Sequence, residues 1–169
     1  DAGSLSDSVI DQLRRQGEWS ECLQNIRPGQ PPGVTTQFKA GYDEAGLYFL
    51  VVCEEPKMPS LMAKAAKDGY DVFADDHIEI FLVPVFGGAS QYQFVCNSQG
   101  KRISSRLDVG TLADPVWTCR AELHDSGWEA AVFIPWKQFE IEEATGSAWG
   151  LNVCRSRNTE GVTGLTWRP

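Results

Sequence analysis

Short runs of β-favouring residues recur along most of this chain, and their close spacing limits the folds it can adopt. From Thr35 onward these runs follow one another at intervals of about 8–12 residues, with Gly, Pro, Asn and Asp clusters between them. No repeated helical pattern separates the runs, which argues against parallel strands joined by crossover helices. The pattern therefore predicts an all-β fold, an antiparallel β-sandwich of about seven to nine strands with short helical insertions.

Two segments carry helical signals, and one turn can be placed directly. Residues 6–17, SDSVIDQLRRQG, combine helical spacing of apolar residues with a serine cap and a terminal glycine. Residues 58–69, MPSLMAKAAKDG, are rich in alanine and predict a short helix on a loop between strands. The DEAG stretch at 43–46 predicts a hairpin turn. We expect one domain, in which residues 1–34 form a helical and irregular segment packed on the sandwich of residues 35–169.

Charge and hydropathy exclude two classes of partner. The 169 residues carry a formal net charge of −8, which opposes binding to nucleic acids and to anionic membranes. No window approaches the roughly 20 apolar residues that a membrane helix needs. We therefore expect no nucleic-acid partner and no membrane insertion. The chain opens DAGSLSDSVIDQ without Met, which we interpret as a piece of a larger parent chain with other domains.

Five cysteines occur at irregular spacing, and no Cys-x-x-Cys pair is present. A zinc or redox motif is therefore not indicated. Cys53, Cys96 and Cys154 lie inside apolar strand-like runs and are expected to be small buried thiols. The spacing allows one disulfide without selecting its partners.

The usual signatures of an enzyme are missing. The chain has two histidines, no Gly-x-Ser-x-Gly elbow and no phosphate-binding loop. His124 lies in a predicted turn and is expected to be solvated. Asp76 and Glu79 could form the carboxyl pair of a glycosidase, but residues three apart on a strand point to opposite faces. We therefore expect a protein that is not an enzyme.

Two cofactor sites can be considered from the residue types. Asp75 and Asp76 lie in an acidic loop and are candidate ligands for calcium, although the spacing differs from the twelve-residue calcium loop. Haem needs axial ligands, for which Met58, Met62 and His77 are the candidates. The chain has no Cys-x-x-Cys-His attachment motif.

Strand alternation places a set of polar residues on one face of a predicted sheet. In VFADDHIEIFLVP, Ile78 and Ile80 point one way and Glu79 the other. By the same alternation Gln93, Asn97 and Asn152 lie on a face that also carries apolar groups. Carboxylates, amides and guanidinium groups such as that of Arg155 suit sugar hydroxyls, which both donate and accept. Aromatic rings nearby suit the apolar faces of sugar rings.

The order of the motifs resembles the family 9 carbohydrate-binding modules. The matching pieces are FKAGYDEAGLYFLVVCEEP, FADDHIEIFLVP, QYQFVCNSQG, GWEAAVFIPWKQF, WGLNVCRSR and TWRP. This resemblance implies a non-catalytic β-sandwich that holds a sugar between two aromatic rings, here Phe73 and Trp167. It also implies polar contacts from Glu79 and Asn97, and structural calcium in several members.

Some positions depart from the family pattern. Phe73 stands where well-known binders have Trp, and Val95 and Cys154 stand where a known binder has polar contacts. With Gln93 and Arg155 added from the sheet face, the expected sugar site is Phe73, Glu79, Gln93, Asn97, Arg155 and Trp167. The ligand is expected to be a mono- or oligosaccharide or the end of a polysaccharide chain.

The sequence thus predicts a carbohydrate-binding module of a larger polysaccharide-processing protein. The resemblance implies an extracellular or cell-envelope location. Two alternatives remain: a structural β-sandwich domain without a ligand, and a haem-binding redox domain of the related sandwich superfamily.

Overall fold

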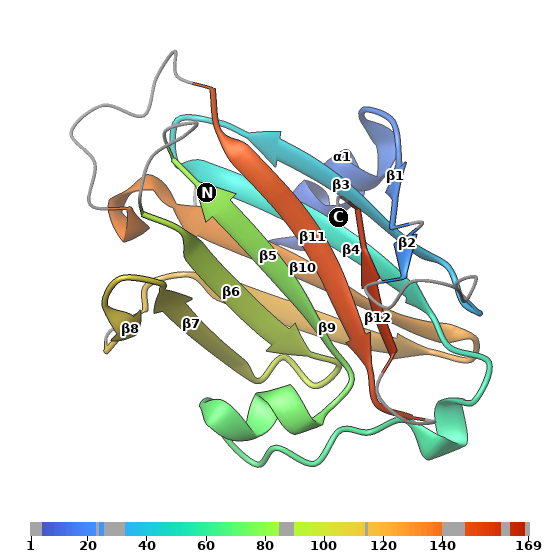
Figure 1. Cartoon of the computed structure of the whole chain (residues 1–169). Helices are drawn as coiled ribbons and strands as arrows, with labels where there is room; N and C mark the ends of the chain where they lie inside the picture. Colours follow the sequence, from blue (N-terminus) through green and yellow to red (C-terminus); the bar gives the residue numbers. More distant parts are fainter. Residues whose placement is uncertain are drawn as a thin grey trace.

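A computed structural model of the chain describes residues 5–22, 24–25, 33–84, 90–113, 115–139, 148–159 and 163–167. Two antiparallel sheets lie in layers, which confirms the predicted β-sandwich (Figure 1). The smaller sheet contains, in spatial order, β1 (Ser20–Glu21), β3 (Thr36–Tyr42), β4 (Gly46–Glu54), β10 (Gly127–Pro135) and β9 (Thr118–His124). The larger contains β2 (Gln24–Asn25), β12 (Thr163–Thr166), β11 (Gly150–Arg157), β5 (His77–Val83), β6 (Tyr92–Asn97), β7 (Arg102–Arg106) and β8 (Gly110–Thr111).

The core lies between the two sheets and follows the predicted alternation. Ile78, Ile80 and Leu82 of β5 join one buried cluster with inward residues of the five-stranded sheet such as Trp128. Each such side chain contributes roughly 1.5–3 kcal/mol through burial. The alternate residues of β5, including Glu79, therefore lie on the outer face of the seven-stranded sheet, the face turned away from its partner sheet.

Three described elements before Thr35 pack on the outer face of the five-stranded sheet or extend the two sheets. Helix α1 (Asp7–Arg15) begins at Ser6, whose side chain caps it as predicted, and Ile10 packs against Leu50 and Ala131 of the five-stranded sheet. Strand β1 pairs with β3, and β2 pairs with β12. The described N-terminal residues thus place helix α1 on the five-stranded sheet and supply a short strand to each sheet. Among the described residues, no helix has the length and hydropathy needed to cross a membrane.

The hairpin predicted at 43–46 is present, whereas the helix predicted at 58–69 is not. Asp43 accepts hydrogen bonds from the backbone N–H groups of Ala45 and Gly46 at 2.8 and 3.2 Å, which fixes the turn between β3 and β4. Only the short 3₁₀ turns η1 (Met58–Ser60) and η2 (Tyr70–Ala74) form between β4 and β5, and 61–66 are neither helix nor strand. This connection runs along one end of the sandwich (Figure 1).

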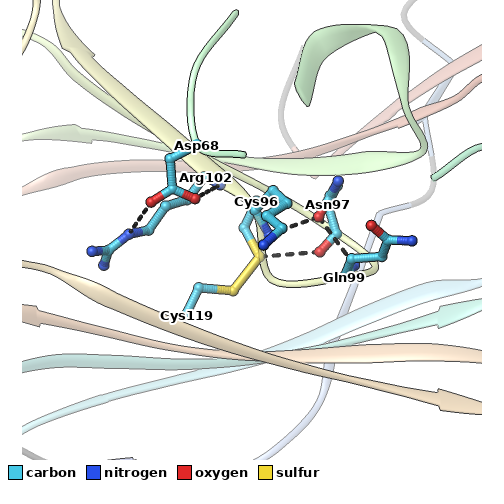
Figure 2. The surroundings of a disulfide bond; sticks show 7 residues. Asp68, Cys96, Asn97, Gln99, Arg102 and Cys119 are labelled. Atoms are coloured by element: carbon cyan, nitrogen blue, oxygen red, sulfur yellow. Dashed lines mark hydrogen bonds and ion pairs between the residues drawn. A yellow bond between two sulfur atoms is a disulfide. The ribbon is translucent and has the colours of Figure 1, made fainter. Parts of the chain in front are cut away.

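One disulfide joins the two sheets. Cys96 on β6 is bonded to Cys119 on β9, 23 residues further along the chain (Figure 2). Cys22, Cys53 and Cys154 are free and buried. The expectation of buried thiols is therefore confirmed for Cys53 and Cys154 and wrong for Cys96.

Candidate functional site

A row of polar side chains crosses the outer face of the seven-stranded sheet. Glu79 on β5 accepts hydrogen bonds from Gln93 Nε2 at 2.6 Å and from Ser156 Oγ at 3.4 Å. Gln93 in turn accepts from Ser105 Oγ at 3.0 Å. The strand registers explain this arrangement, because alternate residues of β11, β5, β6 and β7 point to the same side.

The neighbours of Glu79 favour its charged form. Burial acts to raise the pKa of Glu79, but a hydrogen bond and charge attraction from His77, with hydrogen bonds from Gln93 and Ser156, lower it below the ordinary 4.5. The carboxylate lies 3.5 Å from Nε2 of His77, and 15 % of its side chain is exposed. Glu79 therefore supplies a fixed negative charge that orients the amide of Gln93.

An aromatic edge and a hollow adjoin the polar row. The rings of Tyr70 and Phe73, both on η2, lie with centroids 5.5 Å apart and planes inclined by 55°. Tyr70 is 77 % exposed, whereas Phe73 is half-buried on Val95 and Ile103. Beside the two rings is a depression of about 200 Å³ that also includes Gln93 and parts of β7 and β8. We call this depression the Tyr70 hollow.

Buried hydrogen bonds position η2 and the loop before it. The Asp75 carboxylate accepts hydrogen bonds from the backbone N–H groups of Lys64 and Ala65 at 2.7 and 2.9 Å. It also accepts one from the Asn97 amide at 2.8 Å. Asp75 is 1 % exposed, so these bonds are shielded from water and fix the loop to β6. These hydrogen bonds also hold Phe73 in place, because Phe73 lies two residues before Asp75 in the chain.

Trp167 does not lie beside Phe73, so the predicted sandwich of these two rings is wrong. The ring of Trp167 meets Phe38 edge-on, with centroids 5.4 Å apart, and packs against the core between the sheets. Thr166, the last residue of β12, pairs with Cys154 on the outer side, and the backbone N–H of Trp167 donates to the carbonyl oxygen of Val153 at 2.9 Å.

Asn97 and Arg155 are also corrected, because neither can reach a ligand. Both are completely buried. The Asn97 side-chain oxygen accepts from the backbone N–H group of Gln99 (Figure 2) and from that of Lys101. The Arg155 guanidinium lies between the sheets, 2.7 Å from the carbonyl oxygen of Glu54. Of the six predicted sugar-binding residues, Phe73 and Gln93 line the Tyr70 hollow and Glu79 adjoins it.

The two candidate calcium ligands do not fit a metal ion. Both carboxylate oxygens of Asp75 accept hydrogen bonds from N–H donors. Asp76 is completely buried, and its carboxylate accepts from the N–H of Met62 at 3.1 Å and from the hydroxyl of Thr159 at 2.6 Å. A cation at either carboxylate would have to displace donors that carry partial positive charge. The aspartates thus hold the loop by hydrogen bonding.

Haem and glycosidase chemistry lack a suitable site among the described residues. His77 is buried, with Nδ1 2.7 Å from the carbonyl oxygen of Asp75 and Nε2 facing Glu79. Neither nitrogen is open to an axial haem position. Asp76 is buried, away from the outer face that carries Glu79, so the two carboxyls do not flank a cleft.

Two residues of the site were not predicted from the sequence. Tyr70 follows Gly69, whose φ of 134° permits the sharp entry into η2. An exposed tyrosine next to a glycine gives only a weak signal. Ser105 could have been found by alternation in RISSR, where it faces outward beside Ile103 and pairs with Gln93.

The fold is similar to that of known carbohydrate-binding proteins. A protein of Bacteroides uniformis, provisionally described as carbohydrate-binding, matches 98 % of this chain and 84 % of its own with a TM-score of 0.81 and 17 % identity. A family 9 carbohydrate-binding module of Caldicellulosiruptor kristjanssonii, solved with glucose, matches 98 % of this chain and 78 % of its own, with a TM-score of 0.65 and 16 % identity. The same module with cellotriose gives 0.64 and 15 %, over 98 % and 77 % of the two chains.

At these identities the likeness establishes the fold. The chain has the β-sandwich of family 9 carbohydrate-binding modules, as its motif order predicts. Comparison of the sequence with family profiles and with curated proteins gives no match.

Proposed function

We propose that this chain is a non-catalytic carbohydrate-binding module and that the sugar binds in the Tyr70 hollow. One observation carries the proposal: an aromatic side chain that is 77 % exposed borders a depression lined by the polar row of Gln93 and Ser105. A buried or randomly placed tyrosine would lack this combination of an open ring face and oriented hydrogen-bonding groups. Sugars need both, because their ring faces are apolar and their edges carry hydroxyls.

The geometry favours an aromatic platform over a slot between two rings. Tyr70 and Phe73 are in contact with one another, at 5.5 Å between centroids, which leaves no room for a sugar between them. The hollow of about 200 Å³ is smaller than pockets that enclose drug-sized ligands, about 300 Å³ or more. A single sugar ring or a chain end fits this size better than an internal stretch of polysaccharide.

The similar solved structures suggest which sugars to test, and the disulfide bears on where the protein is located. Since the Caldicellulosiruptor module was solved with glucose and cellotriose, glucose and cello-oligosaccharides are the first ligands to test. The disulfide between the sheets is typical of oxidising compartments, which supports an extracellular or cell-envelope location. We place the module in a larger polysaccharide-processing protein.

Replacing Tyr70 and Phe73 by alanine tests the site. Binding to glucose, cello-oligosaccharides and a wider panel is measured by isothermal titration calorimetry. The wild-type Kd is expected in the micromolar to millimolar range, on the order of −4 to −8 kcal/mol. Tyr70→Ala should weaken binding by about two- to ten-fold, since an aromatic contact contributes about 0.5–1.5 kcal/mol. Tyr42→Ala is the matched control, because Tyr42 is 80 % exposed on the β3–β4 hairpin.

Equal affinity in Tyr70→Ala, Phe73→Ala and Tyr42→Ala would refute the hollow as the site. A structural domain without a ligand is the second candidate, favoured by the inward position of Trp167. That candidate predicts no heat with any sugar of the panel, in the wild type as in the variants.

A further inference from the structure

Three side chains of types that can bind a metal ion lie close together on the outer face of the five-stranded sheet, on the other side of the molecule from the Tyr70 hollow. Glu122 and His124 lie on β9 and Glu129 on β10, and one ligand atom from each lies within 4.8 Å of the other two. Within the described part of the chain, these three residues form a group of His, Cys, Asp or Glu side chains close enough to share an ion. Nε2 of His124 lies 3.7 Å from a carboxylate oxygen of Glu129.

The strand register brings the three side chains together. Glu122 pairs directly with Glu129, and His124 pairs with Gly127 at the end of the hairpin. Residues two apart on a strand share a face, so His124 lies on the same outer face as the Glu122–Glu129 pair. Gly127 has no side chain, and the space that a Cβ there would occupy is taken by the backbone of Cys53, whose carbonyl oxygen would lie 2.1 Å away. No side chain can therefore stand at the position paired with His124.

Glu129 is the fixed member of the group. Its side chain is 10 % exposed, whereas that of His124 is 48 % exposed. One carboxylate oxygen of Glu129 binds Arg14 at 2.5 Å, and the other faces His124. Arg14 also pairs with Asp11 at 3.3 Å. It therefore keeps an acidic partner if Glu129 binds an ion instead of Arg14.

Arg120, the second arginine near the three side chains, also has an acidic partner outside the group. Arg120 binds Glu122 and also Asp7 of α1. It can release Glu122 while its bond to Asp7 remains. Without a cation, two carboxylates directly opposite each other on neighbouring strands repel, and the two arginines partly offset this repulsion.

We propose that Glu122, His124 and Glu129 form a binding site for a divalent transition-metal ion of the zinc type. An imidazole nitrogen with two carboxylates suits zinc, whereas calcium and magnesium prefer oxygen ligands alone. Zinc bonds of about 2.0–2.2 Å in a tetrahedron require the ligand atoms to approach by small side-chain rotations, which the exposed His124 and Glu122 can make. His124 also lines a hollow of about 280 Å³, which the two glutamates do not border. A water molecule is expected as the fourth ligand.

Titration of the full chain, without a histidine tag, with zinc chloride tests the site. Isothermal titration calorimetry should show one zinc ion bound per chain. His124→Ala should weaken zinc binding by about 100-fold or more, since loss of a direct ligand exceeds the 10–100-fold effect of losing an outer contact. Glu129→Gln should do the same. Glu44→Gln is the matched control, because Glu44 is an exposed acid on the β3–β4 turn and should leave binding unchanged.

The outcomes separate this site from the sugar site. Absence of zinc binding by the wild type, or equal affinity in His124→Ala, would overturn the proposal. If Glu129→Gln fails to fold, His124→Ala decides alone, because that side chain is exposed and has no role in the core. Sugar binding measured on the same variants should match the wild type, so failure of one proposal leaves the other standing.

Discussion

At the scale of single residues, the most consequential feature is a carboxylate buried between the sheets. Glu55 is completely buried and accepts hydrogen bonds from Arg157 at 2.6 and 2.8 Å and from Arg155 at 3.3 Å. Burial acts to raise the pKa of Glu55, but hydrogen bonds from Arg157 and the backbone of Lys57, with the charges of both arginines, lower it below 4.5. Glu55 thus links the end of β4 to β11.

Glu55→Gln is expected to destabilise the protein by about 3–5 kcal/mol at pH 7, because it leaves two buried guanidinium groups with reduced compensation. A lowered folded-state pKa means that the contribution of Glu55 is complete above its unfolded value, near 4.5, and is lost as pH falls through the folded value. The difference in the free energy of unfolding between wild type and Glu55→Gln should therefore become smaller as the pH falls below about 4.5. Urea unfolding at pH 7 and at steps down to pH 3 measures it, with Glu44→Gln as the control that should follow the wild type throughout.

The site residues show which signals the sequence carries. Alternation alone places Glu79 and Gln93 on one face, and the structure joins them by a hydrogen bond. The same alternation places Arg155 inward beside Val153. Burial of a guanidinium is stable only because Glu54 and Glu55, about a hundred positions earlier in the chain, supply its partners, and no local pattern reveals such a pair.

At the scale of elements, the segment between β4 and β5 shows tertiary contacts overriding local propensity. The alanine-rich residues 61–66 favour a helix, yet the backbone N–H groups of Met62, Lys64 and Ala65 bind the carboxylates of Asp75 and Asp76. These groups are then unavailable for helical hydrogen bonds. Longer strands such as β4 and β5 were predictable from alternation, whereas two-residue strands such as β8 (Gly110–Thr111) carry too few residues for a pattern.

Asp75→Ala should release this segment. Three buried or half-buried donors lose their acceptor, at about 1–3 kcal/mol each before relaxation. Hydrogen exchange of the Lys64 and Ala65 amides should accelerate, and sugar affinity should fall because Phe73 is no longer held. Asp71→Ala, an exposed change in η2, is the control and should leave both unaltered. If the exchange rates of these amides in the wild type changed with added calcium or a chelator, the segment would not be held by hydrogen bonds alone.

At the scale of the whole molecule, the two sheets are joined by packing and by one covalent bond. The Cys96–Cys119 disulfide crosses the core between β6 and β9, and it was not predictable, because pairing depends on which strands face each other. The other cysteines are shielded. Burial, with smaller effects from neighbouring charges, raises the pKa of Cys22 to about 12. Burial likewise raises that of Cys53 to about 11, although the nearby Arg155 opposes it. Both thiols are therefore unreactive in the folded state.

Removing the disulfide should weaken the sandwich without abolishing it. For a closed loop of 23 residues, loss of the cross-link costs about 3 kcal/mol through the greater freedom of the unfolded chain. The double variant Cys96→Ala/Cys119→Ala should show this loss in urea unfolding, and a reducing agent should lower the stability of wild type by a similar amount while leaving the double variant unchanged. Thiol labelling checks the pairing: unreduced wild type should expose three thiols on unfolding and five after reduction. Five reactive thiols in the unreduced, unfolded chain would show that the sheets are held by packing alone.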